Sequence, residues 1–200
     1  LLDHELEMFK RLHLFNRQAI EFEEREGFIR LVAEGIIDIF ELEASVVYVE
    51  RRSDRSYYRY YAESLVEPVE EENSIIAELL QLSDFASAQH RNVLDAKDFE
   101  KSRVFANYQS GLIVRLQEES TDLNIYLLGL ISKKNAPLYS KQHTSRSTIF
   151  GVFAQQVQAL IANRQQQRKI YEQIQQIRLS DLELKKLSLI ATKTKNGVII

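Results

Sequence analysis

The residue types that carry out most enzyme chemistry are few in this chain and poorly spaced for it. The histidines are His4, His13, His90 and His143. No two of them have metal-ligand spacing, and no serine lies in a G-x-S-x-G turn. Even the closest two glycines, Gly27 and Gly35, are too far apart for a Gly-rich phosphate loop. We therefore expect no catalytic activity from the chain itself.

Cysteine is absent from the sequence. This excludes disulfides, thiolate metal sites, iron–sulfur clusters and thioether-linked chromophores. A histidine could ligate haem iron, but a lone histidine is more often structural. The acidic run 70–72 resembles a solvated helix start more than a cation loop, since such loops alternate carboxylates with other ligands and a turn glycine. We expect no cofactor and no metal.

The composition favours a soluble globular protein. The chain has 200 residues, of which 44% are hydrophobic and 28% charged, and its net charge of -3 gives no reason to expect a nucleic-acid partner. No apolar run approaches the ~18 residues of a membrane span, and the first residues lack the pattern of a signal peptide. We expect a cytoplasmic protein. Because the sequence starts without methionine and stops inside the apolar run 197–200, we interpret it as part of a longer one.

Periodicity in the first half predicts helices around a β-hairpin. Leu2, Leu6, Phe9 and His13 follow a 4-3-4 spacing, typical of a narrow coiled-coil seam, and 17–40 continues as helix with a broader apolar face. Two β-branched and aromatic runs predict a hairpin, and Asn73 is a good N-cap for the next helix. The segment after that helix is ambiguous. The expected elements are strands 45–50 and 57–62, helix 74–82, a short strand near 89–93 and a short helix at 97–107.

The second half predicts a second hairpin and one very long helix. Strands are expected at 112–117 and 123–132, followed by a helix from about 141 to 187, ~70 Å long. That length exceeds the width of a domain of this size, so we expect its far half to leave the body. A heptad register from residue 149 makes its seam partly apolar. Beyond residue 167 the apolar seam residues have only a partner helix to pack against, which predicts a parallel homodimer. These residues are Ile170, Ile174, Ile177 and Leu184.

The order of these elements resembles that of a GAF domain over about residues 17–165. The blocks that carry the resemblance are YQSGLIVRL at 108–116, LGLISKK at 128–134 and LYSKQH at 138–143. Residues 184–200 look like the opening of a PAS domain. A GAF domain, a connecting helix and a PAS domain in this order are similar to the input half of bacterial sensor histidine kinases.

The resemblance implies an α+β fold with a six-stranded antiparallel sheet. Terminal helices would cover one face, and a ligand pocket on the other would be roofed by residues 74–110. The implied organisation is a dimerisation helix at 1–16, a GAF-like sensor at 17–165, a signalling helix at 166–185 and a truncated PAS start at 186–200. Further PAS and kinase domains would follow in the same chain.

The sequence departs from the GAF domains that bind cyclic nucleotides or bilins, because it lacks the Asn-Lys, Phe and Asp-Glu motif of the former and the cysteine of the latter. Any ligand is therefore an unknown small molecule. The polar residues expected at the pocket are His90, Arg91, Tyr108 and Arg115. The main hypothesis is a regulatory input module, and the alternative is a ligand-free structural spacer. A cavity beneath residues 74–110 of about 300 Å³ or more would favour the sensor.

Overall fold

The computed structural model describes residues 2–22, 24–53, 57–62, 72–118, 122–132 and 143–197. Several parts of the sequence analysis lie outside the described residues: positions 70 and 71 of the acidic run, the side chains of the tyrosine-rich strand, the block 138–142 and the end of the expected PAS start at 198–200. The helices are α1 (Leu2–Glu21), α2 (Arg25–Phe40), α3 (Glu72–Ala88), α4 (Ala96–Phe99) and α5 (His143–Gly197). The strands are β1 (Ala44–Arg51), β2 (Tyr57–Ala62), β3 (Val93–Asp95), β4 (Tyr108–Glu118) and β5 (Leu123–Ser132).

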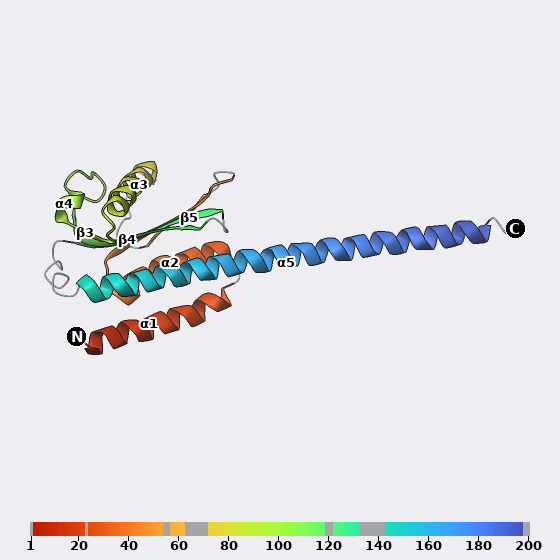
Figure 1. Cartoon of the computed structure of the whole chain (residues 1–200), viewed down its shortest axis with the longest axis horizontal. Coiled ribbons are helices and arrows are strands. Elements are labelled where there is room, and N and C mark those ends of the chain that lie inside the picture. The colour runs from red at the N-terminus through yellow and green to blue at the C-terminus, as the bar shows by residue number, and fades with distance from the viewer. Residues whose placement is uncertain are drawn as a thin grey trace. The chain divides into compact units, whose positions relative to one another are not determined.

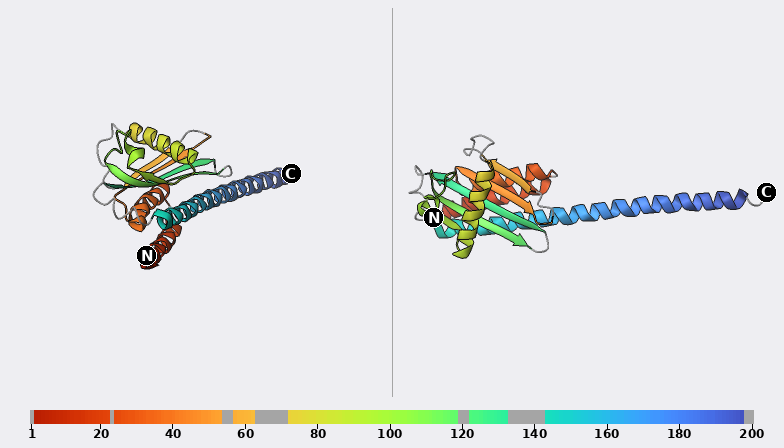
Figure 2. Two further views of the ribbon diagram at one scale, coloured as in Figure 1. Left: turned by 60° about the vertical axis from the view of Figure 1, so that its left-hand side comes forward. Right: turned by 90° about the horizontal axis from the view of Figure 1, so that it is seen from above.

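The strands form one antiparallel sheet in the order β2-β1-β5-β4-β3. Helices α3 and α4 lie on one face of it, and α2 lies on the other with α1 and the start of α5 (Figures 1 and 2). The expected count of six strands is corrected to five in the described part of the chain. Between β3 and β4 the backbone forms α4 and turns, such as the bond from Tyr108 N–H to Phe105 O at 3.0 Å, and adds no further strand there.

Strands β2 and β5 have the bounds that the sequence predicts, 57–62 and 123–132. Helix α3 continues past residue 82 to Ala88, because Phe85 and Ala86 extend its apolar face. The short strand lies at Val93–Asp95, slightly later than expected, and the short helix α4 covers four residues. Helix α5 remains helical to Gly197, so most of the segment expected to open a PAS domain is helix.

The chain divides into two compact units, Leu1–Leu160 and Ile161–Ile200. The boundary expected after residue 16 therefore falls inside α1, and the whole of α1 belongs to the first unit. The second unit consists of the remainder of α5 and the last residues. No helix in the described ranges is long and apolar enough to cross a membrane.

Helices α1 and α5 run parallel where they meet in the first unit. The Ser145 hydroxyl donates to Glu5 at 2.5 Å near their starts, and the Asn16 amide donates to Gln156 at 2.8 Å further along both. Between these bonds the rings of Phe15 and Phe153 are 5.0 Å apart, and Phe40 of α2 packs edge-on against Phe153. Aromatic packing of this kind adds about 0.5–1.5 kcal/mol per pair beyond the area buried. This cluster holds three helices on one face of the sheet.

The other face of the sheet is covered by an apolar core under α3 and α4. Its largest members include aromatic residues from strands, from α4 and from the loop that follows α4: Tyr48, Phe99, Phe105, Tyr108 and Tyr126. Ile75, Leu79 and Leu82 of α3 pack onto them. The centre of the face on which the resemblance implies a ligand pocket is therefore filled by side chains.

Gly129 of β5 allows α2 to approach the sheet closely. A Cβ atom added there would lie 2.3 Å from Leu42 Cδ1 and 2.9 Å from Ile36 Cγ2, both shorter than real contacts. Gly129→Ala should therefore lower the free energy of unfolding by about 1–3 kcal/mol through overpacking. The matched control is Gly151→Ala in α5, where an added Cβ meets nothing within 4 Å. That change should stabilise the helix by up to about 1 kcal/mol. Urea denaturation of both variants measures the contrast, and equal effects would contradict it.

Candidate functional site

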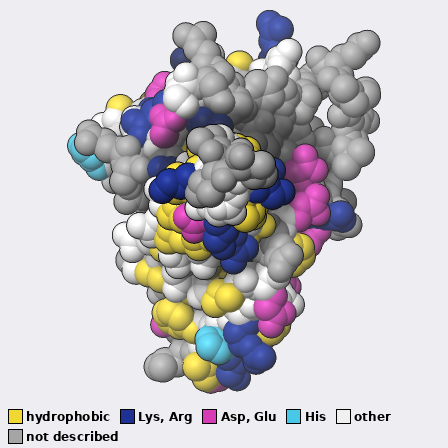
Figure 3. Space-filling view, turned by 90° about the vertical axis from the view of Figure 1, so that its right-hand side faces the viewer, with side chains coloured by type: hydrophobic (Ala, Val, Ile, Leu, Met, Phe, Trp, Pro, Cys, Tyr) yellow, Lys and Arg dark blue, Asp and Glu magenta, His cyan; other side chains and the backbone are white. Residues whose placement is uncertain are grey.

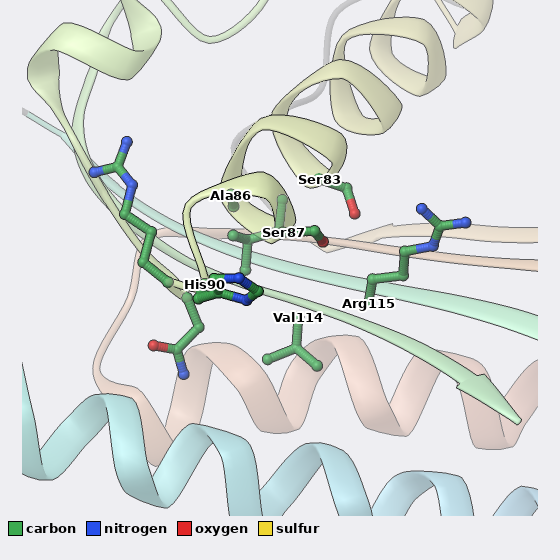
Figure 4. Close-up of a pocket in the computed structure, with 9 residues that line it drawn as sticks. Ser83, Ala86, Ser87, His90, Val114 and Arg115 are labelled. Carbon is green, nitrogen blue, oxygen red and sulfur yellow. The ribbon is translucent and has the colours of Figure 1, made fainter.

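A pocket of ≈ 510 Å³ lies between the end of α3 and strand β4 (Figure 4). Its volume falls within the range of small-molecule sites. Apolar side chains come from Ala86 and Ile113, Val114 lines the pocket with its side chain directed to the other face of the sheet (Figure 4), and the polar lining is Ser83, Ser87, His90, Arg91, Asn92 and Arg115. The pocket thus combines an apolar wall with several hydrogen-bonding groups. Its volume is larger than the about 300 Å³ that we expected of a sensor pocket. The pocket lies beside the filled core.

The last two turns of α3 and the residues just after them position three of these polar groups. Ser83 and Ser87 are four residues apart, so both are on one side of the helix, and their hydroxyls point toward β4 on the side of Arg115 (Figure 4). His90 has a left-handed φ of 51° and follows the helix end. There the N–H of Arg91 donates to Ala86 O at 3.1 Å and the N–H of His90 to Ser87 O at 3.1 Å. These bonds close the helix and direct the chain to β3.

Arg115 is fixed in the pocket wall by two contacts. Its Nη1 donates to Asp84 Oδ1 at 3.0 Å, and its guanidinium lies 5.5 Å from the centre of the Tyr126 ring. Burial raises the pKa of the Tyr126 hydroxyl above its ordinary value, although the positive charge of Arg115 acts in the opposite direction. Asp84 is 73% exposed, so solvent weakens its ion pair with Arg115. The Nε of Arg115 is buried and has no hydrogen-bond partner.

The four sequence-predicted residues divide between the pocket and its surroundings. His90, Arg91 and Arg115 line the pocket. The Arg91 guanidinium points away from it, bound to Asp98 and placed 5.3 Å from the Phe85 ring centre. Tyr108 lies in the core, where burial, and to a smaller extent the Glu43 carboxylate, raise the pKa of its hydroxyl. Tyr108 is therefore not among the residues that line this pocket.

Ser83, Ser87 and Asn92 line the pocket but were not predicted. The two serines were missed because the helix was expected to stop at residue 82. Continuing the apolar spacing through Phe85 and Ala86 would have placed both on the helix face beside that stripe. Asn92 carried no signal in the sequence that separated it from an ordinary turn residue.

Ser83 has the least satisfied side chain of the pocket. The residue is 1% exposed and its hydroxyl has no hydrogen-bond partner. Ser45, which is also fully buried, donates to Ala33 O at 2.7 Å instead. Buried polar atoms in proteins are nearly always hydrogen-bonded, and exceptions often occur at functional sites. An unpaired, buried hydroxyl beside a pocket is therefore a candidate ligand contact.

Asn92 links the pocket to helix α5. Its side-chain nitrogen donates to Ser147 O at 3.1 Å, and the Ser147 hydroxyl donates back to its side-chain oxygen. The carbonyl of Asn92 accepts from Ile113 N–H at 2.8 Å. One residue thus contacts the pocket, β4 and α5.

Glu78 of α3 holds down the segment that follows α4. Its carboxylate accepts hydrogen bonds from the backbone N–H groups of Arg103 at 3.0 Å and Val104 at 3.2 Å, and from the Ser102 hydroxyl.

Among the described residues no cluster of three or more acidic or histidine side chains could hold a metal ion.

No family model and no curated protein matches the sequence. The GAF domain of a phosphoenolpyruvate-protein phosphotransferase from Acinetobacter is similar in structure, with a TM-score of 0.51 and 10% identity, over 78% of this chain and 92% of that one. An N-acylhomoserine lactone dependent LuxR family transcription factor from Burkholderia cenocepacia gives a TM-score of 0.48 and 12% identity, over 78% of this chain and 97% of that one. The first likeness shows that the α+β fold is GAF-like.

If Ser83 keeps an unpaired hydroxyl for a ligand, its removal should stabilise the ligand-free chain. Ser83→Ala is expected to raise the free energy of unfolding by about 1–3 kcal/mol, whereas Ser45→Ala should lower it by about 1 kcal/mol through loss of a buried hydrogen bond. Ser87→Ala, exposed on the same helix, measures the gain from helix propensity alone. Chemical denaturation compares the three. A loss of stability in Ser83→Ala would show that this hydroxyl has a structural partner.

Proposed function

We propose that the chain is a regulatory input module, in which a GAF-like sensor domain binds a small molecule and passes its state along α5 in a parallel homodimer. The module contributes regulation and leaves catalysis to an output domain. The context that the sequence resemblance implies is a bacterial sensor histidine kinase, with a PAS domain and the kinase region following in the same chain. The small molecule would occupy the pocket between α3 and β4.

The apolar seam in the second unit is the observation that carries the proposal. Ile170, Ile177 and Leu184 repeat every seven residues and are 54%, 62% and 63% exposed, with Ile174 between them at 42%. A single helix gains little from such a stripe, because its stability comes mainly from packing an apolar face. A second copy of the same helix, aligned in parallel, would bury these layers as a coiled coil.

Helix α1 supports the dimer from the first unit. Leu6 is 54% exposed, Phe9 is 49% exposed, and Ile20 extends the same 4-3 spacing at 73% exposure. At the lower end of the surface in Figure 3, where Figure 1 places α1, exposed hydrophobic side chains lie between charged ones. The side of α1 that faces its own domain is formed by other residues, including Met8, Leu12 and Phe15. The exposed stripe is therefore a second surface suited to a partner copy.

Asn92 offers a physical route from the pocket to the helix. A ligand that shifts Asn92 would alter its paired hydrogen bonds to Ser147, near the start of α5. Helix α5 is continuous from His143 to Gly197, so a rotation at its start can be carried along it. Allosteric coupling needs such a contact with two arrangements, one of which the ligand prefers.

The alternative function is a structural dimerisation spacer without a ligand. The filled core beneath α3 and α4 favours it, because Tyr48, Phe105 and Tyr108 occupy the centre of that sheet face. A spacer would need only the seam and a stable body. The two functions differ in whether the rotational phase of α5 affects the output.

Charges placed in the seam should separate the dimer. Ile174→Glu combined with Ile177→Glu is expected to weaken association by several kcal/mol, because two carboxylates would be buried against their copies. Leu179→Glu is the matched control: Leu179 is also 62% exposed but lies outside the seam, so this variant should keep the dimer. Light scattering should give twice the 23.3 kDa of one chain for the wild type and the control. A wild-type mass of one chain would contradict the dimer.

Insertions in α5 test whether the helix transmits its rotational phase. One residue inserted after Gln176 rotates the following helix by ~100° and moves Leu184 off the seam, whereas seven residues restore the heptad phase. Output, measured as autophosphorylation of a kinase region joined after Ile200, should be locked on or off by one residue and should match the wild type with seven. Insertions of three and four residues come close to a full turn and should fall between these results.

Equal output across the insertion series would contradict the relay. A spacer that only tethers two domains tolerates all four lengths, because lengthening a connection changes effective concentration gradually. That result would leave dimerisation as the function of α5.

A further inference from the structure

We infer that the pocket between α3 and β4 binds a small amphiphilic monocarboxylate, whose carboxylate contacts Arg115 and Ser83 and whose apolar part lies on β4. This inference rests on the proposed ligand-binding function and specifies the chemical class of the ligand.

The polar groups left open in the pocket are hydrogen-bond donors. Ser83 offers a buried hydroxyl without a partner, and Arg115 offers a buried Nε–H without one. The Arg91 Nε is also unpaired, but that guanidinium is bound to Asp98 and points away from the pocket, so it is not a ligand contact. An acceptor on the ligand would satisfy donors that the protein leaves open, and a charged acceptor forms the stronger bonds.

Arg115 is oriented before any ligand arrives. Asp84 binds its Nη1 and the Tyr126 ring lies against its face, so the Nε edge remains for a further acceptor. A carboxylate matches the planar guanidinium better than a point acceptor does. Because the side chain is already fixed, less conformational entropy is lost on binding.

The local charge balance favours a single negative charge over several. Asp98 compensates Arg91, and Asp84 partly compensates Arg115, so the pocket has no large excess of positive charge. Among the described pocket residues, Arg115 is the guanidinium nearest to such a ligand, and it is bound to Asp84. A phosphate dianion at Arg115 would therefore be repelled by the Asp84 carboxylate. A monocarboxylate carries one negative charge and would be repelled less.

The end of α3 does not oppose an anion as strongly as a bare helix C-terminus would. The carbonyls of Phe85, Ala86 and Ser87 already accept backbone hydrogen bonds from residues 89–91. Such bonds occupy carbonyl oxygens at the C-terminus of the helix and so reduce the negative potential there.

The apolar wall determines the rest of the ligand. Ala86 and Ile113 give the apolar side chains that line a pocket of ≈ 510 Å³, more space than a bare carboxylate needs. Covering apolar surface contributes about 25 cal/mol per Å² removed from water. An alkyl or similar apolar part attached to the carboxylate would gain from this contact.

The test is calorimetric titration of the chain with straight-chain carboxylates from butanoate to octanoate, each beside its uncharged amide, and with inorganic phosphate. We expect saturable binding of at least one carboxylate, about tenfold or more tighter than its amide. Arg115→Gln should weaken carboxylate binding by about tenfold or more. Ser83→Ala should weaken it several-fold while stabilising the ligand-free chain.

Asp84→Asn distinguishes a binding role of Arg115 from a merely structural one, because the two roles predict different effects on carboxylate affinity. It removes the carboxylate that competes for Arg115, so it should tighten carboxylate binding several-fold even if it destabilises the fold slightly. Circular dichroism confirms that each variant is folded before titration.

Three outcomes would overturn the assignment: an amide that binds as tightly as its acid, phosphate that binds more tightly than the acids, or no binding by any of these probes. Equal affinity of the amide would leave the ligand-driven relay intact, because it concerns only the charge of the ligand. Failure of the α5 insertion series would remove the relay and leave carboxylate binding unaffected.

Discussion

The packing of Phe15, Phe40 and Phe153 is the interaction on which the arrangement of the first unit depends. It joins α1, α2 and the start of α5 on one face of the sheet. Because α1 and α5 meet in parallel, their hydrogen bonds and ring contacts fix both the direction and the rotation of α5 at its start. A helix held in this way can respond to a change in the sheet by rotating as a body, which is the kind of motion that a coiled-coil partner can detect.

Asn92 connects that helical layer to the pocket on the opposite side of the sheet edge. Strand β3 pairs with β4 only over Val93–Asp95, and the Asn92 carbonyl makes the next bond, to Ile113. The side chain of Asn92 then reaches Ser147. The short edge strand thus leaves one residue in contact with the pocket, the sheet and α5. In a longer edge strand the ladder would engage β4 further along, where the pocket now lies.

The sequence pattern predicted the elements better than it predicted the pocket. Strand β5 is buried along nearly its whole length, and its apolar run marks both ends correctly. Tyr108 and Arg115 share a sheet face only because the strand has an irregularity between Tyr108 and Ser110, since counting back from Arg115 by twos would put Tyr108 on the opposite face. On that shared face Tyr108 belongs to the filled core, whereas Arg115 lines the pocket. A bulge leaves no periodic signal, and neither does a hydroxyl such as that of Ser83, whose importance depends on the partner it lacks.

The unpaired Ser83 hydroxyl also separates the two proposed functions on energetic grounds. Burying a hydroxyl without a partner costs about 1–3 kcal/mol, comparable with the stability that a whole helix cap supplies. A structural spacer gains nothing from that cost, and alanine in α3 would serve it better. A binding domain does gain, because the open donor becomes satisfied when the ligand arrives, and the ligand-bound state is then stabilised relative to the empty one. The filled core beneath α3 gives this pocket a rigid wall, since the Tyr126 ring packs in that core and lies against the Arg115 guanidinium.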